Sequence, residues 1–267
     1  MANHRSDTAI QLLFSRRRQL ASATWLEIRS RYAGSLIGAG WAILSPLILV
    51  AIYSCIYLFI FKVRVPEMSS YQYVLYVMSG LMPYLMTAEA VSNAVPTIAG
   101  NTQVLSNTVF PVALMPVRSV FSCQGPMVVA APLFIVGSIM LGTASPWLAL
   151  LPIIWLLQLG VVIGVAWLVA LLNTILRDVQ SAIGVVFIIL LIASPFAYTP
   201  EMVPSALKPL IYLNPMAYFI MAYQSVVVLS QPPSPLISVM IIVLGCGGFL
   251  LGGRLFDRLK SGVIDHV

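Results

Sequence analysis

The chain has 267 residues, of which 60% are hydrophobic and only 8% charged, with a formal net charge of +6 and a mean hydropathy of +0.98. These values exclude a soluble globular protein and indicate an integral membrane protein. The polar ends and loops are too short to bury a core of their own, so we expect no separate soluble domain.

The N-terminal residues 8–32 place apolar side chains near helical spacing, with the sequence RRR at 16–18 among the polar positions. This pattern predicts an amphipathic helix in the inner membrane interface, with its arginines near anionic head groups. The alternative is a basic tail without structure that only follows the positive-inside rule. The residues assigned to this helix are Arg16, Arg17, Arg18, Trp25 and Arg29.

Six apolar runs predict transmembrane helices, because about 18 or more apolar residues can cross a hydrocarbon layer about 30 Å thick. In chain order they are 36–61, 71–95, 112–141, 146–172, 179–200 and 235–253. The first run has no small-residue cleavage pattern behind it, so we expect it to stay in the membrane as a span. The predicted fold class is an all-α membrane protein with six transmembrane helices.

The region 201–230 is apolar but contains Pro204, Pro209 and Pro215. With six spans, 11 of the 14 basic residues fall on the side of the termini, and only Lys62, Arg64 and Lys208 on the other. The positive-inside rule then predicts cytoplasmic termini, whereas a seventh span would move the basic C-terminal cluster outside. We therefore expect 201–230 to form re-entrant helices in the outer leaflet, enclosed by protein.

Few residues could support chemistry. The three cysteines stand singly in apolar runs, and His4 and His266 lie in polar tails, so we expect no metal site and no cofactor on this chain. Glu89 is the exception, since it lies in the inner half of the second predicted span. A charge at the bilayer centre costs about 2.5 to 3.5 kcal/mol, which makes a buried acid a functional hypothesis. The alternative is a glutamate that is hydrated or hydrogen-bonded between helices.

The stretch GFLLGGR at 248–254 has the glycine spacing of a phosphate-binding loop, but Arg254 and Leu255 stand where Lys and Ser or Thr are needed. We therefore expect no ATP binding by this chain. Close helix packing through Gly248 and Gly252 is the better interpretation. The same interpretation covers two further pairs, Gly34 with Gly38 and Gly160 with Gly164.

The stretch TILRDVQ at 174–180 separates the fourth and fifth predicted spans. Arg177 falls near the C-terminus of one helix and Asp178 near the N-terminus of the next, where the helix dipoles favour these charges. The pair is thus predicted to anchor a cytoplasmic turn.

Five stretches in this order resemble the membrane subunits of ABC-2 type exporters that move cell-surface polysaccharides such as O-antigen, capsule or teichoic acid. They are RYAGSLIGAGWAILSP at 31–46, SGLMPYLMTAEAVSNAV at 79–95, NTVFPVALMPVRSV at 107–120, LLNTILRDVQ at 171–180 and LIYLNPMAYFI at 210–220. Tyr84 departs from this pattern, because a tryptophan is usual at that position.

The resemblance implies a homodimer that binds two copies of a separate ATPase subunit, which would hold the ATP and Mg²⁺. A cytoplasmic coupling helix between spans two and three maps to about 98–111, where Phe110 and Pro111 would turn the chain into the third span. This stretch lacks the family's common lysines, which favours apolar and hydrogen-bonded contact. The residues expected to meet the ATPase are Gln103, Val104, Leu105 and Asn107. The Arg177 and Asp178 doublet recurs in the family and would lie near the gate helix or the ATPase.

Aromatic side chains gather at the outer ends of the spans, as in interface belts, or they line a conduit in which their faces stack on sugar rings. The resemblance motivates a set of hypothetical channel aromatics, namely Trp41, Tyr53, Tyr57, Tyr84, Phe196 and Tyr198.

The sequence thus predicts a permease subunit in the bacterial inner membrane, with a tail and gate helix at 1–33, a transmembrane domain at 34–257 and a cytoplasmic tail at 258–267. Its expected partners are a second copy, the ATPase, membrane lipids and a lipid-linked polysaccharide, but not nucleic acid. Alternatives are export of a drug or small lipid, and an intramembrane enzyme with Glu89 or Asp178 as base. A secondary transporter is disfavoured, because inverted halves are not evident.

Overall fold

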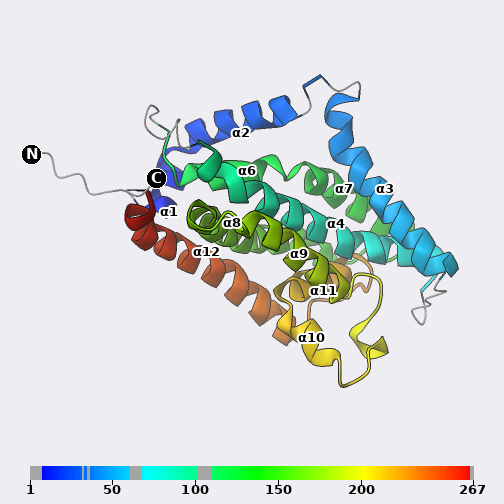
Figure 1. The fold of residues 1–267 in the computed structure, drawn as a ribbon. Coiled ribbons are helices and arrows are strands. Elements are labelled where there is room, and N and C mark those ends of the chain that lie inside the picture. Colours follow the sequence, from blue (N-terminus) through cyan, green and yellow to red (C-terminus); the bar gives the residue numbers. More distant parts are fainter. Residues whose placement is uncertain (1–7, 32, 35–36, 61–67, 102–109, 265–267) are drawn as a thin grey trace, which may run out of the picture.

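A computed structural model of the chain describes residues 8–31, 33–34, 37–60, 68–101 and 110–264 (Figure 1). All regular secondary structure in these residues is helical, which confirms the predicted all-α class. The first third contains α1 (Ala9–Ser15), α2 (Arg17–Arg31) and α3 (Trp41–Cys55), which continues as a π-helical turn at Ile56–Ile60. The middle contains α4 (Ser70–Ala94), α6 (Leu114–Ser122), α7 (Gly125–Met140) and α8 (Leu151–Ile175). The last third contains α9 (Val179–Ile192), α10 (Lys208–Leu213), α11 (Pro215–Val227) and α12 (Pro235–Ile264).

Helix α4 is the centre of the bundle and packs against α3, α6, α7, α8 and α11 (Figure 1). Its most apolar 18-residue window is 78% buried, against 33% for the window in α8 and 22% for that in α12. The helix starts with a capping box, in which Ser69 and Gln72 each bond the other's backbone N–H. The helix contains Pro83, whose carbonyl accepts a hydrogen bond from the buried side chain of Gln158 on α8 at 2.9 Å.

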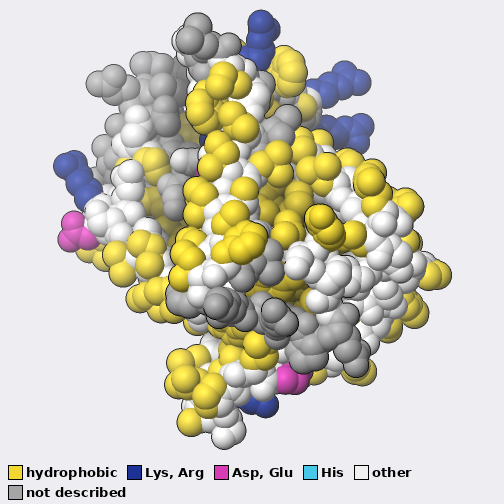
Figure 2. All heavy atoms as spheres, turned by 90° about the vertical axis from the view of Figure 1, so that its right-hand side faces the viewer, with side chains coloured by type: hydrophobic (Ala, Val, Ile, Leu, Met, Phe, Trp, Pro, Cys, Tyr) yellow, Lys and Arg dark blue, Asp and Glu magenta, His cyan; other side chains and the backbone are white. Residues whose placement is uncertain are grey.

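Three helical segments are long and apolar enough to cross a membrane, namely Ser70–Thr97, Pro146–Ile175 and Pro235–Lys260. A fourth crossing is possible if α6 and α7, which are bent by 42° at their junction, form one span. Helix α9 has only 14 residues, or about 21 Å of helix, which is shorter than a hydrocarbon layer of about 30 Å. Six crossings therefore stay a prediction. Hydrophobic side chains cover most of the face in Figure 2.

Two predicted spans are not continuous helices. The run 112–141 divides at Cys123 and Gln124, since Pro126 has no N–H to give to the Ser122 carbonyl and Gln124 instead bonds the Val120 carbonyl through its side chain at 2.8 Å. The run 179–200 is helical only to Ile192, because Pro195 interrupts the helix and the residue before a proline disfavours helical backbone.

The predicted N-terminal helix is present with one break, while its position in the membrane interface stays a prediction. Helices α1 and α2 cover the expected range 8–32 to Arg31 but are separated at Arg16, whose own hydrogen bonds still connect Leu12 and Leu20 along the chain. The α1 N-terminus docks on α12, because the Ala9 N–H lies 3.0 Å from both carboxylate oxygens of Asp257. Helix α12 itself continues to Ile264, past the predicted end of the transmembrane domain at residue 257.

Helices α8 and α12 form the tightest helix pair, because glycines bring their backbones into contact. A Cβ added at Gly160 would lie 2.7 Å from the Gly245 carbonyl oxygen, and one at Gly164 or Gly252 would clash with the backbone of the opposite helix. The predicted packing role is confirmed for these glycines and for Gly248, whose added Cβ would lie 3.0 Å from Val161. It is wrong for Gly34 and Gly38. These two have positive φ angles of 80° and 57°, and no described residue lies within 4 Å of an added Cβ, so they serve as turn residues.

We expect Gly164→Ala and Gly252→Ala to destabilise the chain, because each methyl group would enter the backbone of the facing helix. Overpacking of this kind costs about 1 to 3 kcal/mol, so the midpoint of thermal unfolding of the purified protein in detergent should fall. Gly247→Ala is the matched control, since it lies in the same helix α12 and has nothing within 4 Å of its added Cβ. An equal fall for all three variants would contradict backbone contact as the cause.

Candidate functional site

A cluster of charged side chains joins α2 to the central helices. At the end of α2, Arg31 Nη1 lies 2.5 Å from Glu89 Oε1 on α4 and Arg31 Nη2 lies 4.0 Å from Glu27. Glu27 Oε2 in turn lies 2.5 Å from Arg118 Nε on α6, an ion-pair contact rather than an aligned hydrogen bond. The Ser122 hydroxyl completes the cluster by donating to Glu27 Oε1 at 2.9 Å.

The prediction of a buried acid at Glu89 is wrong. In the described chain its side chain is 44% exposed, and its charge is paired with Arg31. The alternative of a glutamate bonded between helices describes this position. The sequence did not predict that Arg31 pairs with Glu89 or that Arg118 pairs with Glu27. The two residues of these pairs are 58 and 91 positions apart, respectively. One local signal existed, since Glu27 stands four residues before Arg31 on the same helix face.

The ion pair lies on the wall of a cavity of 560 Å³ between α3, α4 and α9. Apart from Arg31, Glu89 and two serines, the cavity is lined by apolar and aromatic groups. Trp41, a predicted channel aromatic, is 42% exposed and contributes to this wall. The other lining residues are Ser45, Leu49, Leu85, Met86, Ala88, Ser92, Pro126, Gly184 and Phe187.

Three further predicted channel aromatics come together at the other end of α3. The ring of Phe196 packs edge-on against Tyr53 and Tyr57, with ring centroids 5.5 and 5.9 Å apart. Tyr53 and Tyr57 are half-buried. Tyr198 is also half-buried, and its hydroxyl donates to the Ile192 carbonyl at 3.4 Å.

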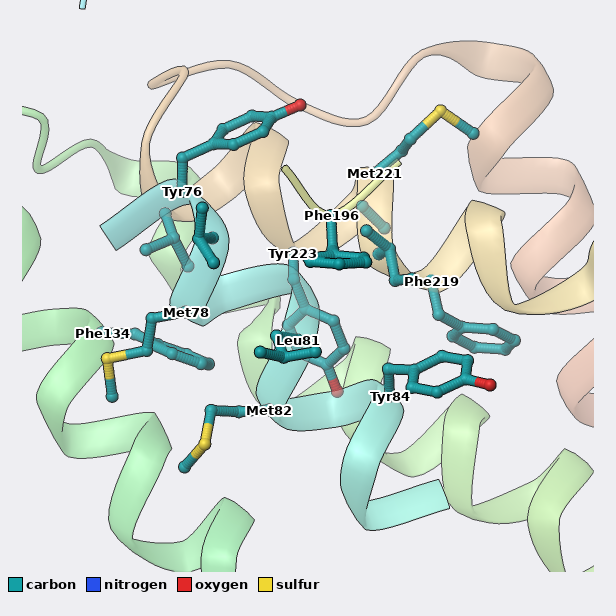
Figure 3. Packing of buried hydrophobic residues seen from close by; sticks show 14 of the residues in the cluster. Tyr76, Met78, Leu81, Met82, Tyr84, Phe134, Phe196, Phe219, Met221 and Tyr223 are labelled. Atoms are coloured by element: carbon teal, nitrogen blue, oxygen red, sulfur yellow. The ribbon is translucent and has the colours of Figure 1, made fainter. Parts of the chain in front are cut away.

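Tyr84 and Phe196 are the most enclosed members of the predicted aromatic set. Figure 3 shows both among the packed side chains of the core, and they are 1% and 3% exposed. The Tyr84 hydroxyl donates to the Phe187 carbonyl, which ties α4 to α9. Within the described chain these two side chains pack the bundle, whereas Tyr53 and Tyr57 are half-buried and Trp41 lines the 560 Å³ cavity.

The aromatic cluster stands on an irregular segment, residues 194–198, whose backbone carbonyls are satisfied by side chains. Gln224 on α11 donates to the carbonyls of Pro195 and Phe196 at 3.0 and 3.3 Å. The hydroxyls of Tyr73 and Tyr76 on α4 donate to the carbonyls of Ala197 and Tyr198 at 2.7 and 3.4 Å, respectively. The segment is therefore held in place from two sides.

The predicted coupling residues Gln103, Val104, Leu105 and Asn107 lie outside the described residues. Phe110 and Pro111 are described and half-buried, and the Pro111 carbonyl accepts the Leu114 N–H at 2.9 Å as the chain enters α6. This agrees with the predicted turn into the third apolar run. Before the gap, the chain forms two 3₁₀ turns at Val95–Thr97 and Ala99–Asn101.

The Arg177 and Asp178 pair lies in the predicted turn between α8 and α9, and both residues are exposed. Asp178 is the N-cap residue of α9, although its side chain makes no capping hydrogen bond. Arg177 and Gln180 line a pocket of 480 Å³ together with Ala99 and Gly100. The turn therefore lines the same pocket as the first residues of the predicted coupling stretch 98–111.

The predicted gate-helix residues Arg16, Arg17, Arg18, Trp25 and Arg29 are all exposed. A groove of 490 Å³ runs between the N-terminal helices and α6, with Arg17 as its charged lining residue. The groove gathers most of the apolar stripe expected from the sequence. Its main apolar residues are Leu13, Phe14, Leu20, Trp25, Ile28 and Phe121.

Comparison with known proteins gives the same family as the resemblance. The model of the ABC-2 type transporter family matches residues 18–228. The chain belongs to this family. Among its relatives are two proteins of Klebsiella pneumoniae named O-antigen export system permease protein RfbA. They are 27% identical over 243 residues and 25% identical over 240 residues, in each case with 88% of this chain and 89% of the relative covered.

A third relative of the same name, from Myxococcus xanthus, is 24% identical over 220 residues, or 81% of this chain and 83% of the relative. The ABC-2 chain is thus a multi-pass membrane protein and the membrane subunit of a transporter. Among the described residues, no group of three or more His, Cys, Asp or Glu side chains could hold a metal ion.

Reversing the charge at Glu89 (Glu89→Arg) should release α2 of this ABC-2 subunit from α4, because two arginines would then meet where Arg31 now pairs with a carboxylate. Limited trypsin digestion should cleave after Arg29 faster than in the wild type. The double variant Arg31→Glu, Glu89→Arg should slow this cleavage again. Glu201→Arg is the control for the change in net charge, since it also adds two positive charges and lies at an exposed position away from α2. Equal cleavage rates in all variants would show that the pair does not hold α2.

Proposed function

We propose that the chain is the permease subunit of an ATP-driven exporter that carries a lipid-linked polysaccharide of the O-antigen kind across the bacterial inner membrane. The observation that carries this proposal is the match to three O-antigen export permeases over more than four fifths of the chain. ATP is hydrolysed by a separate ATPase subunit, and this chain supplies the path.

The proposed topology has six crossings with both termini in the cytoplasm. The crossings are α3, α4, the bent pair α6 and α7, α8, the segment from α9 to about residue 200, and α12. Helix α11, with 13 residues or about 20 Å of helix, is too short to span and forms the re-entrant region with α10. The burial of nearly all of α11 inside the chain supports this proposal, because a re-entrant segment needs protein around it.

The proposed active form is a homodimer whose copies meet near α3 and α9. Helix α9 has no buried residue in the single chain, and its exposed side chains include Val185, Ile188 and Ile189. Helix α3 exposes Ile48 and Ile52 in the same way. Since both helices also line the 560 Å³ cavity, a second copy placed against them would enclose it and the nearby aromatic side chains.

In this proposal the aromatic side chains of α3 guide the sugars. Each sugar ring of a polysaccharide has an apolar face that can stack on an aromatic side chain. Such stacking does not depend on a particular pattern of hydrogen bonds, so successive sugar units can use the same aromatic side chains. The candidates are the exposed Trp41 and the half-buried Tyr53 and Tyr57, and Phe196 packs against the two tyrosines.

Deleting the gene should remove polysaccharide from the cell surface and leave lipid-linked polymer inside the cell, as measured by gel analysis of surface and cytoplasmic glycan. The double variant Tyr53→Ala, Tyr57→Ala should reduce surface polymer strongly at an unchanged level of membrane protein. Phe59→Ala, at a 73% exposed aromatic of the adjoining turn, is the matched control. Normal surface glycan in the deletion strain would refute the proposed function, and normal glycan in the double variant would refute the aromatic path.

The proposed coupling stretch can be tested by the association with the ATPase subunit. Leu105→Glu should abolish its copurification with the permease, because a carboxylate would replace an apolar contact without a partner. Leu207→Glu, at a 50% exposed leucine of the proposed outer region, carries the same change and should leave copurification intact. Retention of the ATPase by the Leu105 variant would exclude this residue from the contact.

A further inference from the structure

A second cavity lies at the far end of the molecule from the charged cluster. It has a volume of 500 Å³ and lies between α4, α10, α11 and the loop that enters α12 at Pro235. The cavity is at the N-terminal end of α12, whereas Asp257, which accepts the hydrogen bond from α1, lies near the C-terminal end of this helix. In the proposed topology this cavity is on the outer side. Its polar and aromatic lining includes Tyr76, Glu201, Tyr212, Gln224, Ser225 and Gln231.

The walls of this outer cavity are fixed within the chain. Four lining prolines restrict the backbone of the 3₁₀ turn at Pro200–Met202 and of the loop 231–235. The loop after α11 is hydrogen-bonded back to it, since the Gln231 N–H donates to the Ser225 carbonyl at 3.1 Å. Ser230, with a φ of 57°, donates its hydroxyl to the Thr143 carbonyl at 2.7 Å. A preformed cavity of this size is typical of sites for small molecules.

The chemistry of the lining suits a neutral sugar. Tyr212 is 42% exposed and offers an aromatic face, while the exposed Glu201 carboxylate and Gln231 amide can accept and donate hydrogen bonds to hydroxyl groups. Among the described lining residues, Glu201 is the single charged one, so a phosphate or another anion has no cation to bind. The lining also contains apolar side chains, but the Glu201 carboxylate disfavours an acyl chain, because hydrocarbon next to a charge costs free energy.

The floor of the outer cavity is connected to the aromatic cluster. Gln224 and Tyr76 both line the cavity, and these same side chains hold the carbonyls of Pro195, Phe196 and Tyr198. In Figure 3, Tyr76 and Met221, which also lines the cavity, lie at one edge of the core, with Phe196 nearer its centre. A ligand in the cavity would therefore lie next to the residues that position the aromatic path.

From this geometry we infer that the outer cavity is a sugar-binding exit site, which takes one unit of a neutral or weakly basic polysaccharide as the polymer leaves the aromatic segment 194–198. This inference rests on the proposed function and adds to it a place and a ligand class. Tyr212 stacks on the sugar ring, and Glu201 and Gln231 form hydrogen bonds with its hydroxyl groups.

The test uses saturation-transfer NMR on the full chain in lipid nanodiscs, with the subunits that copurify. The probe is a set of oligosaccharides, two to six units long, released by mild acid from the polysaccharide of the host strain. Wild-type protein should transfer saturation to the probe. Tyr212→Ala and Glu201→Gln should each weaken binding about tenfold, as expected when an aromatic contact or a charged hydrogen-bond acceptor is lost.

Tyr71→Ala is the matched control, because Tyr71 is a 77% exposed tyrosine that does not line the cavity. Unchanged binding in both cavity variants, or an equal loss in the Tyr71 variant, would overturn the exit site. The two proposals fail in different ways. If surface polysaccharide requires the gene but the probe does not bind in the cavity, only the exit site is wrong. If surface polysaccharide does not require the gene, the proposed function is wrong as well.

Discussion

The architecture depends on satisfying the backbone carbonyls of the irregular segment 194–198 inside a bundle of apolar helices. A buried carbonyl without a partner costs about 1 to 3 kcal/mol, and this segment presents four in succession. Their partners come from the central helix α4 and from α11. The partnership explains why α11 is buried and why Gly80 on α4 lacks a side chain, since an added Cβ there would lie 2.9 Å from Gln224. Asn214 extends the arrangement by donating to the Leu190 carbonyl at 3.1 Å.

The N-terminal helices are attached by apolar packing together with ion pairs. Ala9 and Leu20 are buried in one hydrophobic cluster with residues of α4, α6 and α8. The ion pairs of α2 with α4 and α6 have side chains that are 20 to 44% exposed, and such pairs contribute only about 0 to 1 kcal/mol each. Around α4 the apolar packing is joined by buried hydrogen bonds, as where Tyr223 donates to Gln158 at 2.8 Å.

The sequence was sufficient for the helical class, because long apolar runs leave the backbone no other partner in a bilayer. It also predicted close packing through the glycines of α8 and of α12, since small residues recur at helical spacing, but not that these two helices pack against each other. The end of α9 at Ile192 was missed although Ser194 and Pro195 signal it, because hydropathy alone does not register a proline. The ion pair of Arg31 with Glu89 could not be predicted, as it joins residues 58 positions apart, and a contact at that distance depends on the path of the chain between them. Both Tyr84 and Tyr57 are tyrosines in apolar runs, and only the packing of the helices makes the first fully buried and the second half-buried.

The backbone contact of α8 with α12 has a consequence for motion. At Gly164 and Gly252 the two main chains touch with no side chain between them, so the two helices are expected to move as one rigid body. Since α1 bonds Asp257 and packs Ile10 beside Gly253 on α12, the N-terminal end is attached to this rigid pair through α1 and to α4 and α6 through α2. A displacement of α8 and α12 relative to α4 would therefore pull on the helix break at Arg16. The single non-helical residue Arg16 would then act as a hinge between α1, which moves with α8 and α12, and α2, which stays with α4 and α6.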